Sequence, residues 1–274
     1  MALLLLVASA LLLSAAAGPL PWDEVPDQWS IFCPRVLSAG PQGVACSAEE
    51  ARRSAMAAAI SEVVDNFRRE GRLPSLYRGW LFAVVLARLG LAGPYVEVGV
   101  KAGSFGANFL RHLRNLRNLT SSPPRYYLVD SWRGIENSTS GVHVGDVSQR
   151  NHMIAAIRAL TRYWRYVTFL QLSSEEAAPV FSDGSIGFVY IDARHDYCGV
   201  MQDLNIYWPK LVSGGLLGGD DWYKTPAYMV CDNGSVIPGG VQQAVIDFAA
   251  ERDLPLFVFK TQWLLQKPKK LSIL

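Results

Sequence analysis

The chain is poor in charged residues and lacks the long apolar or basic stretches that define several protein classes. Charged residues make up 18% of its 274 positions, and the formal net charge is +2 with both signs interspersed. No basic block is dense enough for a nucleic-acid surface, so we expect no nucleic-acid partner. The first apolar run, Leu3–Leu13, is short for a membrane span. Half of the residues are hydrophobic, which is enough for a substantial core.

Cysteine is also scarce, at four residues: Cys33, Cys46, Cys198 and Cys231. No two of them have CxxC spacing, which argues against a cysteine zinc site. In an oxidising compartment four cysteines allow two disulfides in three pairings. We expect nearest neighbours to pair, Cys33 with Cys46 and Cys198 with Cys231. The alternative is four buried thiols.

Residues 1–17 are typical of a secretory signal peptide. Leu3–Leu13 has the length of an apolar h-region, and the small residues at 14–17 resemble an A-x-A cleavage site. Three N-glycosylation sequons begin at Asn118, Asn137 and Asn233 and agree with a lumenal or secreted protein. After cleavage we expect no membrane span. Because no Lys or Arg precedes the apolar run, a signal anchor or an organelle-targeting segment is the alternative.

The remaining chain divides into an N-terminal part, residues 18–90, and a larger part, residues 91–274. In the first we expect an irregular arm, then a helical cap of two helices, one opened by a capping box at Ser47–Glu50 and one over Ser75–Arg88. In the second, short apolar runs alternate with amphipathic stretches. This predicts an α/β fold, with a Rossmann-like, mostly parallel seven-stranded sheet flanked by helices. The expected strands are Tyr95–Gly99, Tyr126–Asp130, Val167–Leu172, Phe188–Asp192, Gly215–Gly218, Leu256–Lys260 and Gln262–Gln266.

A glycine-rich turn follows the first of these strands, in residues 96–106, VEVGVKAGSFG. Glycine lets the backbone approach a ligand, and the following helix N-terminus offers free amide groups. The spacing does not meet the dinucleotide fingerprint G-x-G-x-x-G. It resembles the first motif of class I methyltransferases, which receives the amino acid part of S-adenosylmethionine. The resemblance implies cofactor binding by Glu97, Gly99, Gly103 and Ser104; the alternative is a simple tight turn.

The second strand ends in Asp130, about thirty residues further on. An acidic side chain at this position can accept hydrogen bonds from both ribose hydroxyls of the cofactor. The alternative is a helix N-cap or a loop charge. Trp132 and Arg133 follow, and we expect them to line the adenosine site or the acceptor cleft.

The most specific pattern spans VYIDARHDY at 189–197 and SGGLLGGDDW at 213–222, with Asp203, Trp208 and Leu211 between them. It resembles small class I methyltransferases with an IDxxHxY…D…W…L…GG…DD signature, related to metal-dependent sugar O-methyltransferases. The resemblance runs from about Tyr95 to Trp222. It includes residues 172–178, which border the adenine in that family and place Ser174 among the cofactor-binding residues.

Three aspartates, Asp192, Asp220 and Asp221, end two strands that are neighbours in such a sheet. Their carboxylates should converge at the edge where ligands bind, and close carboxylates repel unless a proton, a base or a cation separates them. Mg²⁺ is the natural cation, and it would hold and activate an acceptor hydroxyl. By resemblance the three aspartates are its ligands. Alternatively, Asp221 caps a following helix.

His195 lies beside this cluster, and we expect it, with Asp192, to be catalytic. Its role would be general base on an acceptor hydroxyl. The competing interpretation is a structural histidine bonded to Asp203 or to a backbone carbonyl. The polar segment 134–150 is either a lid or a surface loop.

These features predict a methyltransferase that uses S-adenosylmethionine, with Mg²⁺ as an optional second cofactor. The expected reaction is O-methylation of a hydroxylated small molecule or saccharide. A non-catalytic lumenal binding protein with the same fold is the alternative, and a nicotinamide-dependent oxidoreductase is a weaker one. The acceptor and the oligomeric state, a homo-oligomer included, stay open.

Overall fold

The computed structural model describes residues 29–33, 51, 54–70, 77–116, 124–134, 145–222, 229–231, 234–237 and 240–269. The predicted signal peptide, the three sequon asparagines, the capping box at Ser47 and most of the segment 134–150 lie outside these residues. The helices are α3 (Ala55–Glu70), α4 (Tyr77–Leu89), α5 (Ser104–Leu116), α6 (Asp146–Leu160), α7 (Ser174–Ala177), α8 (Tyr197–Tyr207) and α9 (Gly240–Glu251). Short 3-10 turns follow α6 and α7, at Thr161–Tyr163 and Ala178–Val180.

A single large sheet organises the molecule, and its strands run in the order β1-β9-β10-β6-β5-β2-β3-β4. All seven predicted strands are present as β2 (Tyr95–Val98), β3 (Tyr126–Val129), β4 (Val167–Leu170), β5 (Ile186–Ile191), β6 (Leu211–Gly219), β9 (Leu256–Phe259) and β10 (Gln262–Gln266). The pairs from β6 through β4 are parallel, while β10 runs antiparallel to both its neighbours. The predicted α/β class and mostly parallel sheet are therefore confirmed.

The sheet has eight strands where the sequence predicts seven. The additional strand is β1 (Ser30–Phe32), which lies in the predicted irregular arm and pairs antiparallel with β9. Three residues are too few to show the alternation that identifies a strand. A second, two-stranded sheet joins β7 (Met229–Val230) to β8 (Val236–Ile237).

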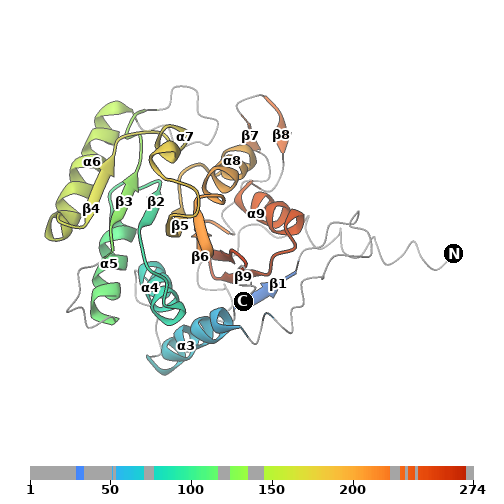
Figure 1. The fold of residues 1–274 in the computed structure, drawn as a ribbon. Coiled ribbons are helices and arrows are strands. Elements are labelled where there is room, and N and C mark those ends of the chain that lie inside the picture. Colours follow the sequence, from blue (N-terminus) through green and yellow to red (C-terminus); the bar gives the residue numbers. More distant parts are fainter. Residues whose placement is uncertain are drawn as a thin grey trace.

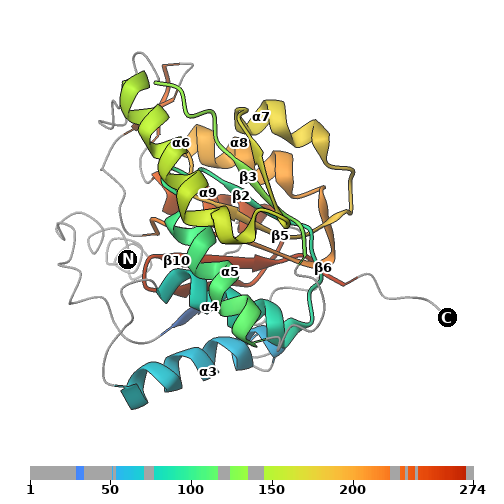
Figure 2. The same ribbon diagram turned by 90° about the vertical axis from the view of Figure 1, so that its left-hand side faces the viewer.

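Helices cover both faces of the large sheet (Figures 1 and 2). Alternate strand residues point to opposite faces, so Tyr190 lies in one core and its neighbour Val189 in the other. The first core is closed by α3, α4, α5 and α6, and the second by α8 and α9. Figure 2 looks onto the side where α3 to α6 lie. Such two-sided burial explains why the central strands read as continuous apolar runs.

The helix α4 packs directly on the sheet, next to α5. Its Phe82 ring lies 5.2 Å from the Phe188 ring and 5.1 Å from the Tyr190 ring, measured between centroids. The predicted helical cap thus includes a helix that forms part of the domain's own helical layer. Its neighbour α3 begins after Ser54, whose hydroxyl accepts a hydrogen bond from the Ala57 amide at 3.2 Å.

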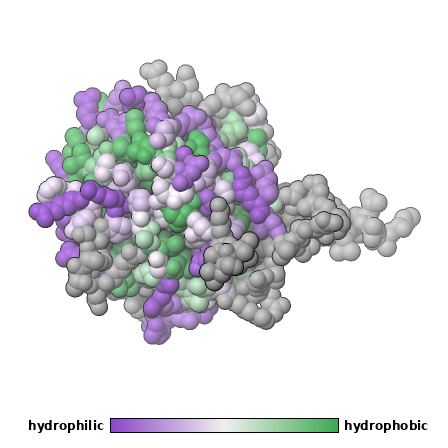
Figure 3. All heavy atoms as spheres, viewed as in Figure 1, coloured by the Kyte–Doolittle hydropathy of each residue, from purple (hydrophilic) through white to green (hydrophobic). Residues whose placement is uncertain are grey.

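One predicted disulfide is confirmed, between Cys198 and Cys231, with a Cα–Cα distance of 5.5 Å. Cys33 is also disulfide-bonded, and its predicted partner Cys46 lies outside the described residues. Among the helices that the structure describes, none is both long and apolar enough to cross a membrane. On the face seen in Figure 3, hydrophilic and hydrophobic residues are interspersed.

Candidate active site

The predicted site residues follow strands whose carboxyl ends meet at one edge of the sheet. Backbone hydrogen bonds extend the strand ladders into these positions: the Asp192 amide donates to Val98 O at 2.8 Å, and the Asp130 amide to Leu170 O at 3.2 Å. The chain order reverses between β2 and β5, since β3 lies on one side of β2 and β5 on the other. Ligands of open α/β sheets bind at such a switch point.

The glycine loop, residues 99–103, lies at this point. Gly99 has φ +87°, and a Cβ added to it would lie 2.1 Å from the Asp192 carbonyl oxygen. Gly103 has φ +74° and precedes α5, whose first residue, Ser104, is exposed. The positive φ favours glycine at both positions, and at Gly99 the nearby Asp192 carbonyl also leaves no room for a side chain. The loop and the chain at Asp192 are in direct contact.

Asp130 holds the glycine loop in place. Its Oδ2 accepts from the amides of Val100 and Lys101, both at 2.9 Å, and its Oδ1 accepts from the Trp132 amide at 2.8 Å. The Trp132 indole in turn donates to the Lys101 carbonyl at 2.9 Å. An ionised carboxylate has about four acceptor sites, so Oδ1 keeps capacity for a ligand hydroxyl. The loop role, given above as the alternative, is present in the structure.

Glu97 is buried within the sheet. It is 1% exposed, lies within β2 and accepts a hydrogen bond at 2.7 Å from the Tyr126 hydroxyl. A Cβ on Gly106, in the first turn of α5, would lie 2.6 Å from its Oε2. Burial raises the pKa of Glu97 to about 8. In the structure the Glu97 carboxyl therefore lies between β3 and the first turn of α5.

Ser174 also turns inward, at the start of α7. Its hydroxyl donates to a carboxylate oxygen of Asp203, whose pKa is raised to about 7 by burial. The preceding Ser173 is the helix N-cap, and it forms a capping box with Glu176. The structure therefore pairs Asp203 with Ser174 and not with His195, which removes one of the structural alternatives given for the histidine.

His195 and the aspartates form what we call the acidic cluster: Asp192, His195, Asp220 and Asp221. His195 Nε2 lies 3.0 Å from Asp221 Oδ2 and 3.7 Å from Asp192 Oδ1. Burial, with Asp220 and Asp221 nearby, raises the pKa of Asp192 to about 6. Asp221 Oδ2 thus contacts the histidine; residues 223–228, where a helix capped by Asp221 would begin, lie outside the described residues, so the capping alternative stays a prediction.

Asp220 differs from the other two aspartates because the protein itself satisfies both its oxygens. Oδ1 accepts from Thr261 Oγ1 at 2.6 Å and from Gln262 Nε2 at 2.5 Å. Oδ2 forms an ion pair with Nη1 of Arg78, a residue of α4. These contacts do not fit a magnesium ion held by three aspartates. Arg78 is the residue that sequence reasoning missed, because nothing in an isolated arginine near the start of a helix indicates a partner 142 positions away.

Backbone strain gathers at the same edge of the sheet. Lys101, Trp132 and Asp221 follow β2, β3 and β6, and all have positive φ, at 51°, 43° and 63°. A bulky residue such as tryptophan rarely adopts this conformation. Strained backbone persists where surrounding structure enforces it, and it concentrates at functional sites. The strain therefore points to the same edge as the acidic cluster.

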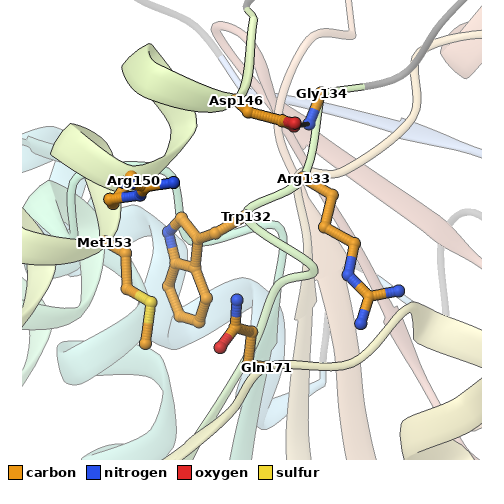
Figure 4. Close-up of a pocket in the computed structure, with 7 residues that line it drawn as sticks. All are labelled: Trp132, Arg133, Gly134, Asp146, Arg150, Met153 and Gln171. Carbon is orange, nitrogen blue, oxygen red and sulfur yellow. Dashed lines mark hydrogen bonds between the residues drawn. The ribbon is translucent and has the colours of Figure 1, made fainter.

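A hollow of about 410 Å³ opens beside the ends of β3 and β4 (Figure 4). Trp132, Arg133 and Gln171 line it from the strand ends, and Arg150 and Met153 line it from α6. The Gly134 amide donates to Asp146 Oδ1 at 2.7 Å, which ties the end of the β3 loop to the start of α6. Trp132 and Arg133, which we expect to line the adenosine site or the acceptor cleft, both line this hollow.

Part of this chain is similar to known methyltransferase domains. A family model described as "Methyltransferase domain" matches residues 96–222. A search of curated proteins finds no match. The calicheamicin methyltransferase CalS11 shares the fold, with 14% identity and a TM-score of 0.50 over 84% of this chain and 99% of that chain.

Two further solved structures match less well. The O-methyltransferase NovP has 19% identity and a TM-score of 0.48 over 71% of this chain and 79% of that chain. TomG from Streptomyces achromogenes, an O-methyltransferase solved in complex with S-adenosylmethionine, has 15% identity and a TM-score of 0.47 over 77% and 90%. The segment 96–222, which contains the glycine loop and the acidic cluster, matches the methyltransferase-domain family.

Proposed function

We propose that the chain is an S-adenosylmethionine-dependent O-methyltransferase acting on a hydroxylated small molecule or saccharide. The observation that carries the proposal is the contact between Gly99 and the Asp192 backbone. It sets a loop suited to the donor against the chain at Asp192, whose Oδ1 lies 3.7 Å from Nε2 of His195, a histidine suited to deprotonate an acceptor. A methyl group and an attacking oxygen must meet in line, and the closeness of these two parts supports a reaction of this kind.

The donor would lie along the carboxyl ends of β2, β3 and β4. The glycine loop and the N-terminus of α5 suit the amino acid end, where backbone amides can meet its carboxylate. The free capacity of Asp130 Oδ1 suits a ribose hydroxyl. The hollow beside Trp132 and Gln171 suits the adenosine end.

When bound, S-adenosylmethionine supplies a methyl group on a positively charged sulfur. His195 takes the proton of the acceptor hydroxyl, and Asp221 and Asp192 stabilise the resulting imidazolium across 3.0 and 3.7 Å. A bound donor would pass its methyl group to the deprotonated oxygen, its carbon–sulfur bond would break with the electron pair left on sulfur, and neutral S-adenosylhomocysteine would be the product.

The first test is calorimetric binding of S-adenosylhomocysteine to the purified full chain. We expect binding by the wild-type protein and its loss in Gly103→Val, which fills the loop at a residue with positive φ. Absence of binding to folded wild-type protein would overturn the proposal. Binding without transfer to any hydroxylated acceptor in a screen would instead favour the lumenal binding protein.

We further propose that the protein works in the secretory pathway. The disulfide between Cys198 and Cys231 supports an oxidising compartment. Its presence agrees with the apolar N-terminal run and the sequons. Mass spectrometry of the protein secreted from cultured cells would test this: a chain beginning near residue 18 is expected, and a cytosolic chain that keeps Met1 would contradict it.

A further inference from the structure

Arg78 contacts two aspartates of the acidic cluster, and it comes from a different layer of the fold. It is the second residue of α4, whereas the aspartates follow β5 and β6. One guanidinium nitrogen, Nη1, contacts both Asp220 Oδ2 and, at 3.5 Å, Asp192 Oδ2. The same nitrogen therefore lies between two carboxylates that a bridging cation would also have to share.

We infer that the Arg78 guanidinium is the resident cation of the acidic cluster and replaces the divalent metal ion that three converging aspartates would otherwise require. Arginine stays protonated under all working conditions. It therefore balances the cluster permanently, and no metal has to be captured from solution. The inference concerns the same site as the proposed function. Only its consequence for methyl transfer rests on that function.

Charge and coordination both oppose a second cation at this position. Mg²⁺ and its analogues need about six oxygen ligands at about 2.0–2.1 Å in a near-octahedral shell. Asp220 offers a metal no open oxygen while Arg78 is in place, since Oδ1 already accepts from Thr261 and Gln262 and Oδ2 is paired with Arg78. A metal ion at Asp192 and Asp220 would also lie against the guanidinium, and like charges in a partly buried site repel strongly.

The packing of α4 keeps Arg78 in this position. The adjacent Tyr77 hydroxyl lies 3.0 Å from Thr261 Oγ1, the same group that donates to Asp220. One turn further along, Phe82 is fully buried against the sheet. With the helix held at both points, the backbone of Arg78 is fixed beside the cluster, and its contacts with Asp220 and Asp192 orient the guanidinium.

A second possible ligand set lies on the other side of Asp192. Ligand atoms of Asp192, His195 and Asp221 lie within 4.8 Å of one another. This set excludes Asp220 and uses an imidazole, a combination that suits zinc or another transition metal better than magnesium. It would also occupy the histidine that the proposed mechanism uses as base. Metal binding that is lost on substitution of Asp220 would indicate the first site, and binding that is lost on substitution of His195 would indicate the second.

The test is titration of the purified full chain with Mn²⁺, with unbound ion followed by electron paramagnetic resonance. Wild type and Arg78→Lys, which keeps the positive charge, should show no binding that depends on Asp220. Arg78→Ala should gain at least about tenfold in Mn²⁺ affinity, because a like charge is removed from a partly buried site. The gain should vanish when Asp220→Asn is added.

Arg88→Ala is the matched control, since Arg88 belongs to the same helix but pairs with Glu62 at the surface. It should behave like wild type. Mn²⁺ binding to the wild type that is lost in Asp220→Asn would overturn the inference, and so would a folded Arg78→Ala that gains no affinity. Wild-type binding lost only in His195→Gln would assign the ion to the second ligand set and also count against a metal-free cluster.

The same samples separate this inference from the proposed function. S-adenosylhomocysteine binding tests the donor site and does not involve Arg78, whereas Mn²⁺ binding tests the cluster and does not require turnover. If Arg78→Ala fails to fold, the wild-type titration compared with Asp220→Asn still decides the question. Methyl transfer that is unchanged in EDTA is the expected consequence for activity.

Discussion

Glu97 places an ionisable group inside the central sheet, and its replacement by glutamine should change how stability depends on pH. Burial raises the folded-state pKa to about 8, against 4.5 for the ordinary side chain. An acid with a raised pKa contributes stability that is fully present below its unfolded pKa and is lost as pH rises through the folded one. The difference of about 3.5 units, at about 1.4 kcal/mol per unit, sets an upper limit of about 5 kcal/mol on the loss.

Urea unfolding from pH 5 to pH 9 measures this effect. Wild type should lose a few kcal/mol of unfolding free energy across this range from Glu97 alone, with an upper limit of about 5 kcal/mol. Glu97→Gln cannot ionise, yet its amide oxygen can still accept from Tyr126, so its stability should fall much less. Glu62→Gln, on the surface, is the control and should follow the wild type. Parallel curves for wild type and Glu97→Gln throughout the range would refute the reasoning.

Three further predictions concern the loop, the base and the disulfide. Gly99→Ala should lower the unfolding free energy by about 2–4 kcal/mol in urea, because overpacking and a positive φ add together. It should also abolish S-adenosylhomocysteine binding. A decrease in unfolding free energy below about 0.5 kcal/mol would contradict the contact with Asp192. His195→Gln should leave that binding intact and lower methyl transfer by about 10²–10⁴-fold, whereas His112→Gln on α5 should not; equal transfer rates would exclude His195 as base. Cys198→Ser should lower stability by about 3–4 kcal/mol, because the disulfide to Cys231 closes a loop of 33 residues; the difference should disappear in reductant, and a variant as stable as oxidised wild type would contradict it.

Most of the fold could be predicted because strands that are buried on both faces have a recognisable apolar sequence pattern. Strands such as Ile186–Ile191 are buried at every position, so they appear as short uninterrupted apolar runs. The edge strand Ser30–Phe32 is three residues long and only partly buried, so it has no apolar run that would identify it. Its pairing with Leu256–Phe259 depends on where the arm returns to the sheet, which no local pattern determines.

The location of the site could be predicted better than the direction of its side chains. Strand-end residues are brought together by topology, so Gly99, Asp130 and Asp192 lie at one edge as expected. Side-chain direction depends on neighbours that are distant in sequence. Tyr126 donates a hydrogen bond to Glu97, and Ser174 donates one to Asp203. Both Glu97 and Ser174 were predicted to bind cofactor, and the sequence pattern gave no sign of these protein partners.

The acidic cluster shows why a motif rich in carboxylates does not by itself predict a metal. Converging aspartates establish that negative charge must be balanced, since close carboxylates repel. Either a metal ion or a positively charged side chain can balance this charge. Which of them does so depends on whether the fold places such a side chain beside the carboxylates. Here Arg78 arrives from a helix more than a hundred residues earlier in the chain, and its position follows from how α4 packs on the sheet. The choice between metal and guanidinium is therefore made by packing between the helical layer and the sheet. A variant that shifts α4 should alter metal affinity without any change to an aspartate.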